Sequence, residues 1–420
     1  EEFTVSVDTR GAVSYFAHTI AEDAPGENLG TAEARGIAQE FIEKSLGKNL
    51  GEYTEKDAHE TVLKNRTDHT FSYEKMVGGI ARRVSVTLYG TEIGSVGEYT
   101  FVPDEFARNE ETTDSTGYIL VTIAGFLYFI LAGAAIVIIF RKYRAGTASL
   151  RIFAQISLGM FLLACLAGIA AGNLFYSSSP TTIPWEAFVT SAIIGYITGV
   201  ARGLVLPILI FGVAGTANEG KESEGTFLEV WKGFLAGCGF LGYIALFYYI
   251  GFTYLGIWSP LSPEIVDAFG STFPIISIVL TSLGAALVEE FSFRYFGVSF
   301  FKKYTKSTFL ALLIPAILWA FLHSTYAVYP MYTRGIELTI AGIFFGYLYL
   351  YHGIFVAVVA HYVVDAVLLS APLARSATPS GVLSSLVAVF LVFLIPPIWR
   401  KIAKPQVLLH STNEESLQQY

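Results

Sequence analysis

The second half of the chain carries a few ionisable residues inside stretches that are otherwise apolar. Glu289 and Glu290 stand side by side in one stretch, His323 lies in the next, and His361 and Asp365 share a later one. Glutamate and histidine are common proton acceptors in enzymes, and ionisable groups at membrane depth are costly unless they serve a function. These residues therefore predict a buried polar site that performs acid–base chemistry.

The spacing within each stretch indicates how the groups are arranged. Glu290 and Arg294 are four residues apart, so on an α-helix they share a face and can form an ion pair. Glu289 then points about 100° away and is left free. His361 and Asp365 are also four apart and can converge on one atom. By itself, the Glu290–Arg294 pair would be typical of an interfacial ion pair, so the prediction of a site rests on all of the groups together.

The depth of three of these groups supports one shared site. Glu289 lies about two residues from the middle of its apolar stretch, His323 lies about four residues from the middle of its own, and His361 lies at the middle. At a helical rise of 1.5 Å per residue, all three groups are within roughly 6 Å of one plane. A water molecule between Glu289 and His323 could lose a proton and attack a carbonyl carbon. His361 with Asp365 could stabilise the resulting oxyanion.

The elements that must position these residues are long apolar stretches. They lie near residues 117–140, 152–175, 187–214, 228–257, 272–301, 309–329, 335–351, 353–370 and 381–399. A helix needs about 20 apolar residues to cross some 30 Å of hydrocarbon, so the sequence predicts an all-α polytopic membrane bundle of about eight or nine transmembrane helices. The stretches 335–351 and 353–370 meet at His352 and Gly353 and could therefore form a tight hairpin.

Three motifs occur in order along this part of the chain. Glu289 to Arg294 reads EEFSFR and fits EExxxR, Trp319 to His323 resembles FxxxH, and the segment from His361 to Asp365 resembles HxxxN/D. Their order, intervals and membrane context resemble the CAAX protease and bacteriocin-processing (CPBP) family, which includes type II CAAX prenyl endopeptidases. The resemblance covers roughly residues 225–400.

The resemblance implies an intramembrane glutamate protease. By analogy Glu289 is the base, and His323 is its partner in holding the attacking water. His361 and Asp365 fall where the family has its oxyanion-stabilising pair. Glu290 and Arg294 would organise the site.

The chain departs from the family pattern at two positions. Trp319 stands where phenylalanine is usual, which we expect to change the volume of the pocket but not the chemistry. Asp365 stands where asparagine is common, and an ionised aspartate cannot donate a hydrogen bond to an oxyanion. Asp365 must therefore be protonated, orient His361, or bind something positive.

The last of these options keeps a metal site open. Glu289, His323, His361 and Asp365 are all acceptable zinc ligands, and members of the family have often been labelled metalloproteases. We favour a reaction without metal or other cofactor, with zinc-dependent hydrolysis as the alternative.

Charge is distributed unevenly along the chain. Of its 420 residues 53% are hydrophobic and 15% are charged, a composition that argues against a soluble enzyme. Residues 1–116 contain 11 Lys and Arg against 22 Asp and Glu, whereas the rest contains 16 against 13. This predicts a small acidic soluble domain joined to a large membrane domain, and no basic patch suggests binding to nucleic acid.

The acidic segment shows the patterns of an α+β domain. Strands are expected at Phe3–Val7, Val13–Ile20, His69–Glu74, Arg82–Tyr89 and Gly97–Val102, with a helix capped by Thr31 and stopped by Gly47. This order of elements is similar to that of small PepSY-like domains. The expected divisions are an extracytoplasmic domain at 1–113, N-terminal transmembrane helices and a loop at 114–224, a protease core at 225–400, and a tail at 401–420.

Basic residues between the stretches predict the orientation in the membrane. With residues 1–116 outside, the inner loops receive Arg141, Lys142, Arg144, Arg151, Lys221, Lys232, Lys302, Lys303, Lys306, Arg400, Lys401 and Lys404, and the outer connections only Arg334 and Arg375. The positive-inside rule then predicts a multi-pass protein of the plasma or inner membrane with its C-terminus in the cytoplasm. The chain starts at Glu1, which is compatible with removal of a signal peptide or a first membrane helix.

Two further charged residues lie within apolar stretches. Glu337 begins its stretch and is expected at the outer membrane interface. Arg202 lies inside its stretch and is a candidate counter-ion for Glu337 or for the site.

These observations favour an intramembrane endopeptidase that hydrolyses a peptide bond of a membrane-associated or lipid-modified substrate. A proton-coupled transporter could use the same acids as a relay, although no inverted repeat is visible between the two halves. A non-catalytic membrane sensor is the third reading. In each case the acidic domain could bind an extracytoplasmic ligand and modulate access of the substrate.

Overall fold

The structure is a computed structural model that describes residues 2–7, 13–146, 183–203, 220–260 and 273–394, together with positions 158, 159, 162, 165, 166 and 396. The chain divides into two compact units, which are described separately below. One unit comprises Glu1–Glu111 with Pro180–Pro184, and the other Thr112–Ser179 with Trp185–Tyr420.

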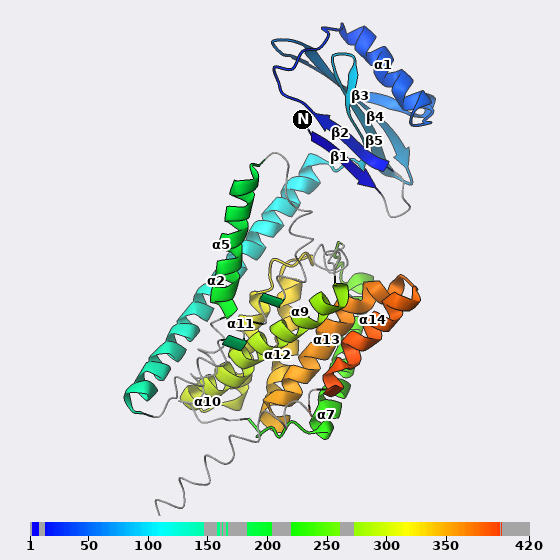
Figure 1. The fold of residues 1–420 in the computed structure, drawn as a ribbon. Helices are drawn as coiled ribbons and strands as arrows, with labels where there is room; N and C mark the ends of the chain where they lie inside the picture. The colour runs from blue at the N-terminus through cyan, green and yellow to red at the C-terminus, as the bar shows by residue number, and fades with distance from the viewer. Residues whose placement is uncertain are drawn as a thin grey trace, which may run out of the picture. The chain divides into compact units, whose positions relative to one another are not determined.

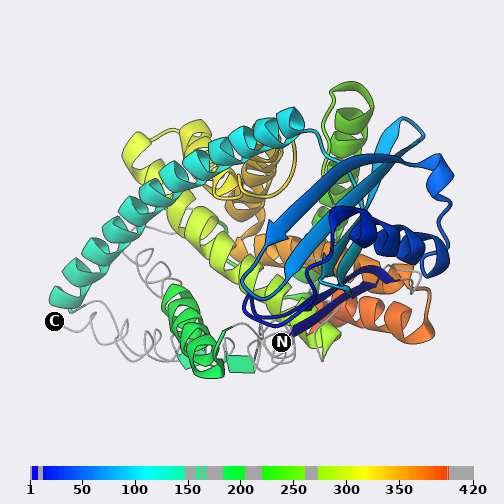
Figure 2. The same ribbon diagram turned by 90° about the horizontal axis from the view of Figure 1, so that it is seen from above.

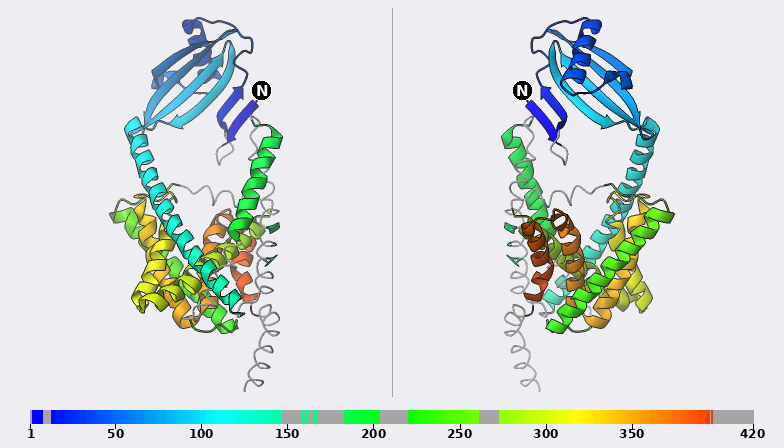
Figure 3. Two further views of the ribbon diagram at one scale, coloured as in Figure 1. Left: turned by 90° about the vertical axis from the view of Figure 1, so that its left-hand side faces the viewer. Right: turned by 90° about the vertical axis from the view of Figure 1, so that its right-hand side faces the viewer.

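The first unit is built on a six-stranded antiparallel sheet with strand order β1-β2-β6-β5-β4-β3. The strands are β1 (Glu2–Val7), β2 (Val13–Thr19), β3 (Thr54–Val62), β4 (Thr67–Val77), β5 (Ile80–Tyr89) and β6 (Glu92–Thr100). Helix α1 (Thr31–Lys44) lies across one face of this sheet (Figure 3). Its small residues Ala34 and Ala38 and the larger Ile42 recur every four positions, and this stripe packs on the apolar face of β4 and β5.

The predicted N-terminal sheet domain is confirmed, with differences in detail. Strand β3 was not predicted, because all of its residues are exposed and an edge strand without a buried face shows no apolar alternation. The expected cap of α1 is wrong: Gly30 occupies the cap position, and the Thr31 hydroxyl donates instead to Glu60 Oε2 at 2.7 Å.

The second unit consists of helices. They are α2 (Asp104–Arg144), α5 (Trp185–Gly203), α7 (Phe227–Tyr254), α9 (Pro274–Glu289), the π-helix η2 (Glu290–Val298), α10 (Ser299–Thr305), α11 (Thr308–Phe321), α12 (Tyr332–His352), α13 (Ile354–Arg375), α14 (Pro379–Phe390) and the short 3₁₀ helix η3 (Leu391–Leu394). The start of α2, up to Glu111, is counted with the first unit, as is the short 3₁₀ turn η1 (Leu50–Glu52). Helices α12, α13 and α14 lie side by side, and α2 runs past α10 and α11 (Figures 1 and 2).

Four helical stretches in the described residues are long and apolar enough to span a membrane. They are Ser115–Arg141, Phe227–Tyr254, Pro274–Thr305 and Ile354–Arg375. Shorter apolar helices are Trp185–Gly195, Thr308–Phe321 and Pro379–Leu394. The predicted helical membrane domain agrees with this, but the count of eight or nine transmembrane helices stays a prediction. The stretch predicted at 152–175 falls almost wholly outside the described residues, as do the end of 187–214 and the tail at 401–420.

Helix α13 is the centre of the second unit, because α7, α9, α12 and α14 all pack against it. Glycines make the approach of α7 close: a Cβ atom added at Gly233 would lie 2.6 Å from Val359, and one at Gly237 would lie 2.8 Å from the carbonyl oxygen of Ala360. On the other side Gly353, at φ 96°, is the single residue between α12 and α13. The predicted tight hairpin is thus present, and it fixes the depth of α13 relative to α12.

Candidate active site

Glu289 lies at the C-terminal end of α9 and is the point on which the site converges. Its Oε1 lies 3.8 Å from Nε2 of His323, and its Oε2 lies 3.7 Å from Nε2 of His361. Oε2 also accepts a hydrogen bond from Nε1 of Trp319. The Glu289 side chain is 22% exposed, so a carboxylate between two imidazoles remains reachable from outside the helix bundle.

His323 lies in the turn that follows α11, and its orientation is fixed by the backbone. Its Nδ1 is 2.8 Å from the carbonyl oxygen of Trp319. A carbonyl only accepts, so Nδ1 carries the proton and donates, and Nε2 is the atom that faces Glu289. In its neutral form His323 therefore presents a lone pair toward the carboxylate.

His361 is located near the middle of α13 and contacts carboxylates through both ring nitrogens. Its Nδ1 lies 2.7 Å from Oε1 of Glu290, while its Nε2 lies 3.5 Å from Oδ2 of Asp365 and 3.7 Å from Glu289. Glu290 and Glu289 thus sit on opposite edges of one imidazole ring. This places the two neighbouring carboxylates in different environments, in agreement with their predicted divergence on the helix.

The predicted ion pair between Glu290 and Arg294 is present and fully buried. Nη1 of Arg294 donates to Oε1 of Glu290 at 2.8 Å, and the same oxygen accepts from His361. The guanidinium carbon of Arg294 lies 4.1 Å from the Trp319 ring and 5.3 Å from that of Phe345. A buried charge needs this kind of compensation, so Arg294 and two aromatic rings hold Glu290 under His361.

The stretch predicted as one regular helix changes geometry at the site. After α9 ends, residues Glu290–Val298 form a π-helix before α10 continues. π-Helical turns are wider than α-helical ones and occur frequently at functional sites. The change starts between Glu289 and Glu290, where the chain must direct two successive carboxylates to the two sides of His361.

Trp319 has a larger part in the site than its position in the motif suggested. The expectation that tryptophan alters only the volume of the pocket does not hold, because its indole N–H donates to Glu289 and its ring covers Arg294. Phenylalanine could provide the ring but not the donor. Asp365, which is 25% exposed, lies beside His361 and adds negative charge near Nε2.

The zinc alternative can be compared with this geometry. Within the described part of the chain, no group of three or more His, Cys, Asp or Glu residues is arranged to hold a metal ion. Nevertheless each histidine directs Nε2 toward Glu289 while its Nδ1 contacts a carbonyl or a carboxylate, as metal-ligating histidines do. Zinc binding by these residues therefore remains a hypothesis.

A charged pair that the motifs do not include lies on α12. Glu337 was expected at the membrane interface, but its side chain is fully buried and pairs with Arg334, three residues earlier. The Arg334–Glu337 spacing was the signal in the sequence that could have identified the pair. The side chain of Arg202, the proposed counter-ion, lies outside the described residues.

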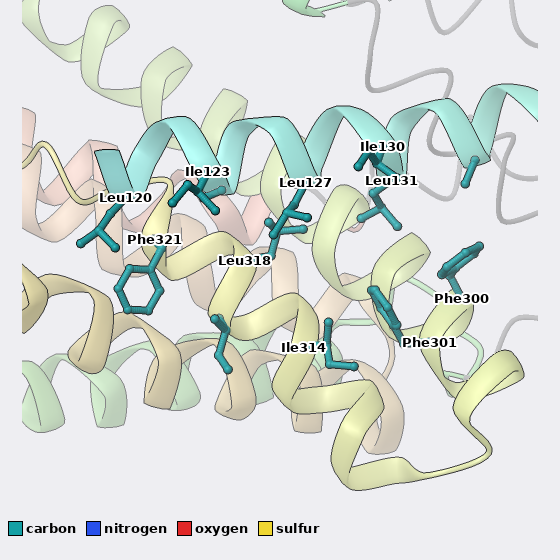
Figure 4. Close-up of a pocket in the computed structure, with 13 residues that line it drawn as sticks. Leu120, Ile123, Leu127, Ile130, Leu131, Phe300, Phe301, Ile314, Leu318 and Phe321 are labelled. Carbon is teal, nitrogen blue, oxygen red and sulfur yellow. The ribbon is translucent and has the colours of Figure 1, made fainter. Parts of the chain in front are cut away.

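An apolar groove of about 610 Å³ runs beside the site, between α2, α10 and α11 (Figure 4). Leu127 and Leu131 of α2 face Leu318 of α11 across it, and Phe300 lies at one end and Phe321 near the other. Leu318 precedes Trp319 in the chain, and Phe321 is two residues before His323. Helix α11, which carries Trp319 and leads into His323, therefore also forms one wall of the groove.

Comparisons with known proteins agree with the motifs. Residues 271–367 match the family model of type II CAAX prenyl endopeptidase Rce1-like proteins, and this segment contains all three motifs. The sporulation-killing factor biosynthesis protein SkfC of Bacillus subtilis (strain 168) is 24% identical over 315 residues, which cover 72% of this chain and 62% of SkfC. No solved structure matches the chain significantly. Residues 271–367 are therefore similar to type II CAAX prenyl endopeptidases, and the chain resembles the CAAX protease and bacteriocin-processing family.

Proposed function

We propose that the chain is an intramembrane endopeptidase that hydrolyses a peptide bond with a water molecule activated by Glu289. The family supports a membrane protease. The observation that carries the finer proposal is that Nε2 of His323 and Nε2 of His361 both approach the Glu289 carboxylate, within 3.8 Å. A water molecule beside this carboxylate could contact both Glu289 and an imidazole nitrogen.

In the proposed reaction Glu289 takes one proton from a water molecule, and Nε2 of His323 holds this water by accepting a hydrogen bond from its other O–H. The water oxygen bonds to the substrate carbonyl carbon, and the carbonyl electron pair moves onto oxygen. Nε2–H of His361 donates to this oxyanion. Since Glu290 accepts from Nδ1, His361 needs its cationic form, for which Glu290 and Asp365 supply counter-charges. Collapse of the intermediate breaks the C–N bond, and Glu289 returns the proton to the leaving amine.

The central test is cleavage of a labelled peptide by purified protein in liposomes. Glu289→Gln keeps the size of the side chain but cannot accept the proton, so turnover should fall by at least about a hundredfold. The thermal unfolding midpoint should stay within a few degrees of that of the native chain. Full cleavage by the variant would refute the assignment.

The same assay separates the alternatives. If the reaction needs zinc, a chelator should abolish cleavage and added zinc should restore it, whereas the metal-free mechanism predicts no effect of chelation. A proton-coupled transporter would instead show substrate-dependent proton uptake into liposomes without peptide cleavage.

We propose that the substrate is membrane-associated or lipid-modified, and that the groove between α2 and α11 accommodates its apolar part. Filling the groove with Leu127→Trp should raise KM for a lipid-modified peptide by roughly tenfold, the equivalent of losing one or two kcal/mol of apolar contact. KM for the unmodified peptide should change little. Leu235→Trp on α7, which lies at an exposed position away from the groove, is the control, and equal effects of both substitutions would remove this idea.

SkfC is named for the biosynthesis of a sporulation-killing factor, so we propose an exported peptide as a second class of substrate. We further propose that residues 1–113 lie outside the cell and bind an extracytoplasmic ligand or the substrate. A proteomic comparison of cells carrying the native chain with cells carrying Glu289→Gln should reveal the substrate as a precursor that accumulates only with the variant.

A further inference from the structure

A second cluster of charge, in which Glu337 is buried and Arg334 is partly buried, lies beside the proposed catalytic residues. Arg334 Nη1 donates to Oε2 of Glu337 and to the hydroxyl of Tyr248, which lies 3.4 Å away. Tyr248 in turn donates to Glu337 at 3.3 Å, and Tyr243 donates to the Glu337 carbonyl oxygen at 3.1 Å. Two tyrosines of α7 therefore hold an ion pair of α12 in place.

A contribution to stability alone does not explain the Arg334–Glu337 ion pair. Glu337 Oε1 and Arg334 Nε are both buried and have no hydrogen-bond partner among the described residues. Unpartnered polar atoms are costly, and buried ion pairs often stabilise a fold less than apolar residues of the same size. A role in positioning other groups would account for a charged pair at this place.

The cluster reaches the site through one aromatic ring. The guanidinium carbon of Arg334 lies 5.4 Å from the centre of the Tyr326 ring. Tyr326 stands at 88° to the His323 ring, with 5.3 Å between their centres. The His323 ring also contacts Trp319, at 5.4 Å between the ring centres and 73° between the planes. The His323 ring thus contacts two aromatic rings, and one of them, Tyr326, also contacts Arg334.

His323 needs such support because of its place in the chain. It follows the end of α11, in a turn, and only its Nδ1 is tied down by a helix carbonyl group. This hydrogen bond restrains only one of the two ring nitrogens, and a small change in the side-chain torsions of His323 would carry Nε2 away from Glu289. Catalytic groups held loosely lose much of their effect.

We propose that Arg334, anchored by Glu337 and Tyr248, positions Tyr326 so that this ring fixes the imidazole of His323 with Nε2 toward Glu289. The inference rests on the proposed function, in which His323 holds the attacking water. Arg334 and Tyr326 are positioning residues, since they act through His323.

The kinetic test separates kcat from KM. Tyr326→Leu removes the ring and should lower kcat by about ten- to a hundredfold with KM changed less than twofold. Tyr326→Phe keeps the ring and should restore most of kcat. Arg334→Met should lower kcat in the same way, and Arg334→Lys should restore part of it. Tyr347→Leu, at an exposed tyrosine on α12, is the matched control and should leave kcat unchanged.

A second measurement does not depend on turnover. In protein labelled with ¹³C and ¹⁵N at histidine, the signals of His323, assigned with His323→Gln, should shift or broaden in Tyr326→Leu and Arg334→Met but not in Tyr326→Phe. Unchanged His323 signals in both variants, or an unchanged kcat in Tyr326→Leu, would overturn the inference. If the native chain cleaves no peptide while the His323 signals respond as expected, the positioning holds and the proposed function fails.

Discussion

At the scale of single residues, the two histidines of the site are set by different partners. His323 takes its orientation from a backbone carbonyl group, whereas His361 takes it from the buried carboxylate of Glu290. A carbonyl is neutral and a carboxylate is negative, so the two imidazoles experience different electrostatic surroundings. This difference suits a site in which His323 accepts a hydrogen bond from water and His361 donates one to an oxyanion.

Trp319 gives a prediction at this scale. Trp319→Phe should keep the ring over Arg294 but remove the donor to Glu289, and a hydrogen bond to a charged group is worth about 1.5–3 kcal/mol. If about half of this is expressed in the transition state, kcat should fall roughly tenfold. Steady-state cleavage of the labelled peptide measures the effect. The kcat of Trp319→Leu, which loses both the ring and the donor, should fall further. Equal rates for the native chain and Trp319→Phe would show that the hydrogen bond has no role in the reaction.

At the scale of elements, the packing of α7 on α13 decides where His361 lies. The close approach depends on two buried glycines, Gly233 and Gly237, one turn apart on α7. Small residues four apart allow the backbones of membrane helices to approach. The same helix α7 carries Tyr243 and Tyr248, so its distance from α12 and α13 also affects Glu337.

Gly237→Ala is therefore expected to destabilise the helical unit. The added Cβ would lie 2.8 Å from the Ala360 carbonyl oxygen and 3.0 Å from Val363, and overpacking of this kind costs about 1–3 kcal/mol. Gly239→Ala is the matched control, because nothing lies within 4 Å of its added Cβ and alanine favours a helix by about 1 kcal/mol. Thermal unfolding in detergent should show a lower midpoint for Gly237→Ala than for Gly239→Ala. A Gly237→Ala midpoint equal to that of the control would mean that α7 is not tightly packed here.

At the scale of the whole molecule, the chain combines two units with different physical chemistry. The sheet unit has an apolar core between α1 and one sheet face, with many charged side chains outside it. The helical unit exposes many large apolar side chains on its helices, as a membrane protein does. Conditions that change the charge of buried groups in one unit should therefore not unfold the other.

Tyr73 offers such a test in the sheet unit. Burial, together with the negative charge of Glu55, raises the pKa of the Tyr73 phenol from 10 to about 12. Between these values the unfolded chain releases the proton and the folded chain keeps it, so the stability of the sheet unit should decrease as the pH rises from 10 to 12. Pulse proteolysis of the full chain in urea, read by mass spectrometry, follows each unit separately.

In that experiment Tyr73→Phe should weaken the alkaline loss of stability, because no phenol remains to ionise at this position. Tyr99→Phe, at an exposed position of the same sheet, serves as the control. An identical pH dependence in the native chain and in Tyr73→Phe would show that Tyr73 does not contribute.

Local patterns were predictable to different degrees along the chain. The pairs Glu290–Arg294 and His361–Asp365 depend only on helical spacing, and both are present at 2.8 and 3.5 Å. Strand β3 was missed because an exposed edge strand has no apolar period. The burial of Glu337 was missed because its partners Tyr243 and Tyr248 come from a helix about 90 residues away. The roles of the seven site residues, the orientation in the membrane and the domain boundaries remain predictions.

The sequence by itself determined that the chain has an acidic sheet domain and an apolar helical part, and that Glu289, His323 and His361 lie at similar depth. These properties follow from composition and from the constant rise of a helix. The packing of the helices was needed to see that the indole of Trp319 donates to Glu289, that Glu290 and Glu289 take opposite edges of His361, and that Tyr326 contacts both Arg334 and His323. Such contacts join side chains of different helices, and their geometry depends on interhelical packing over a few ångströms, which helical periodicity does not specify.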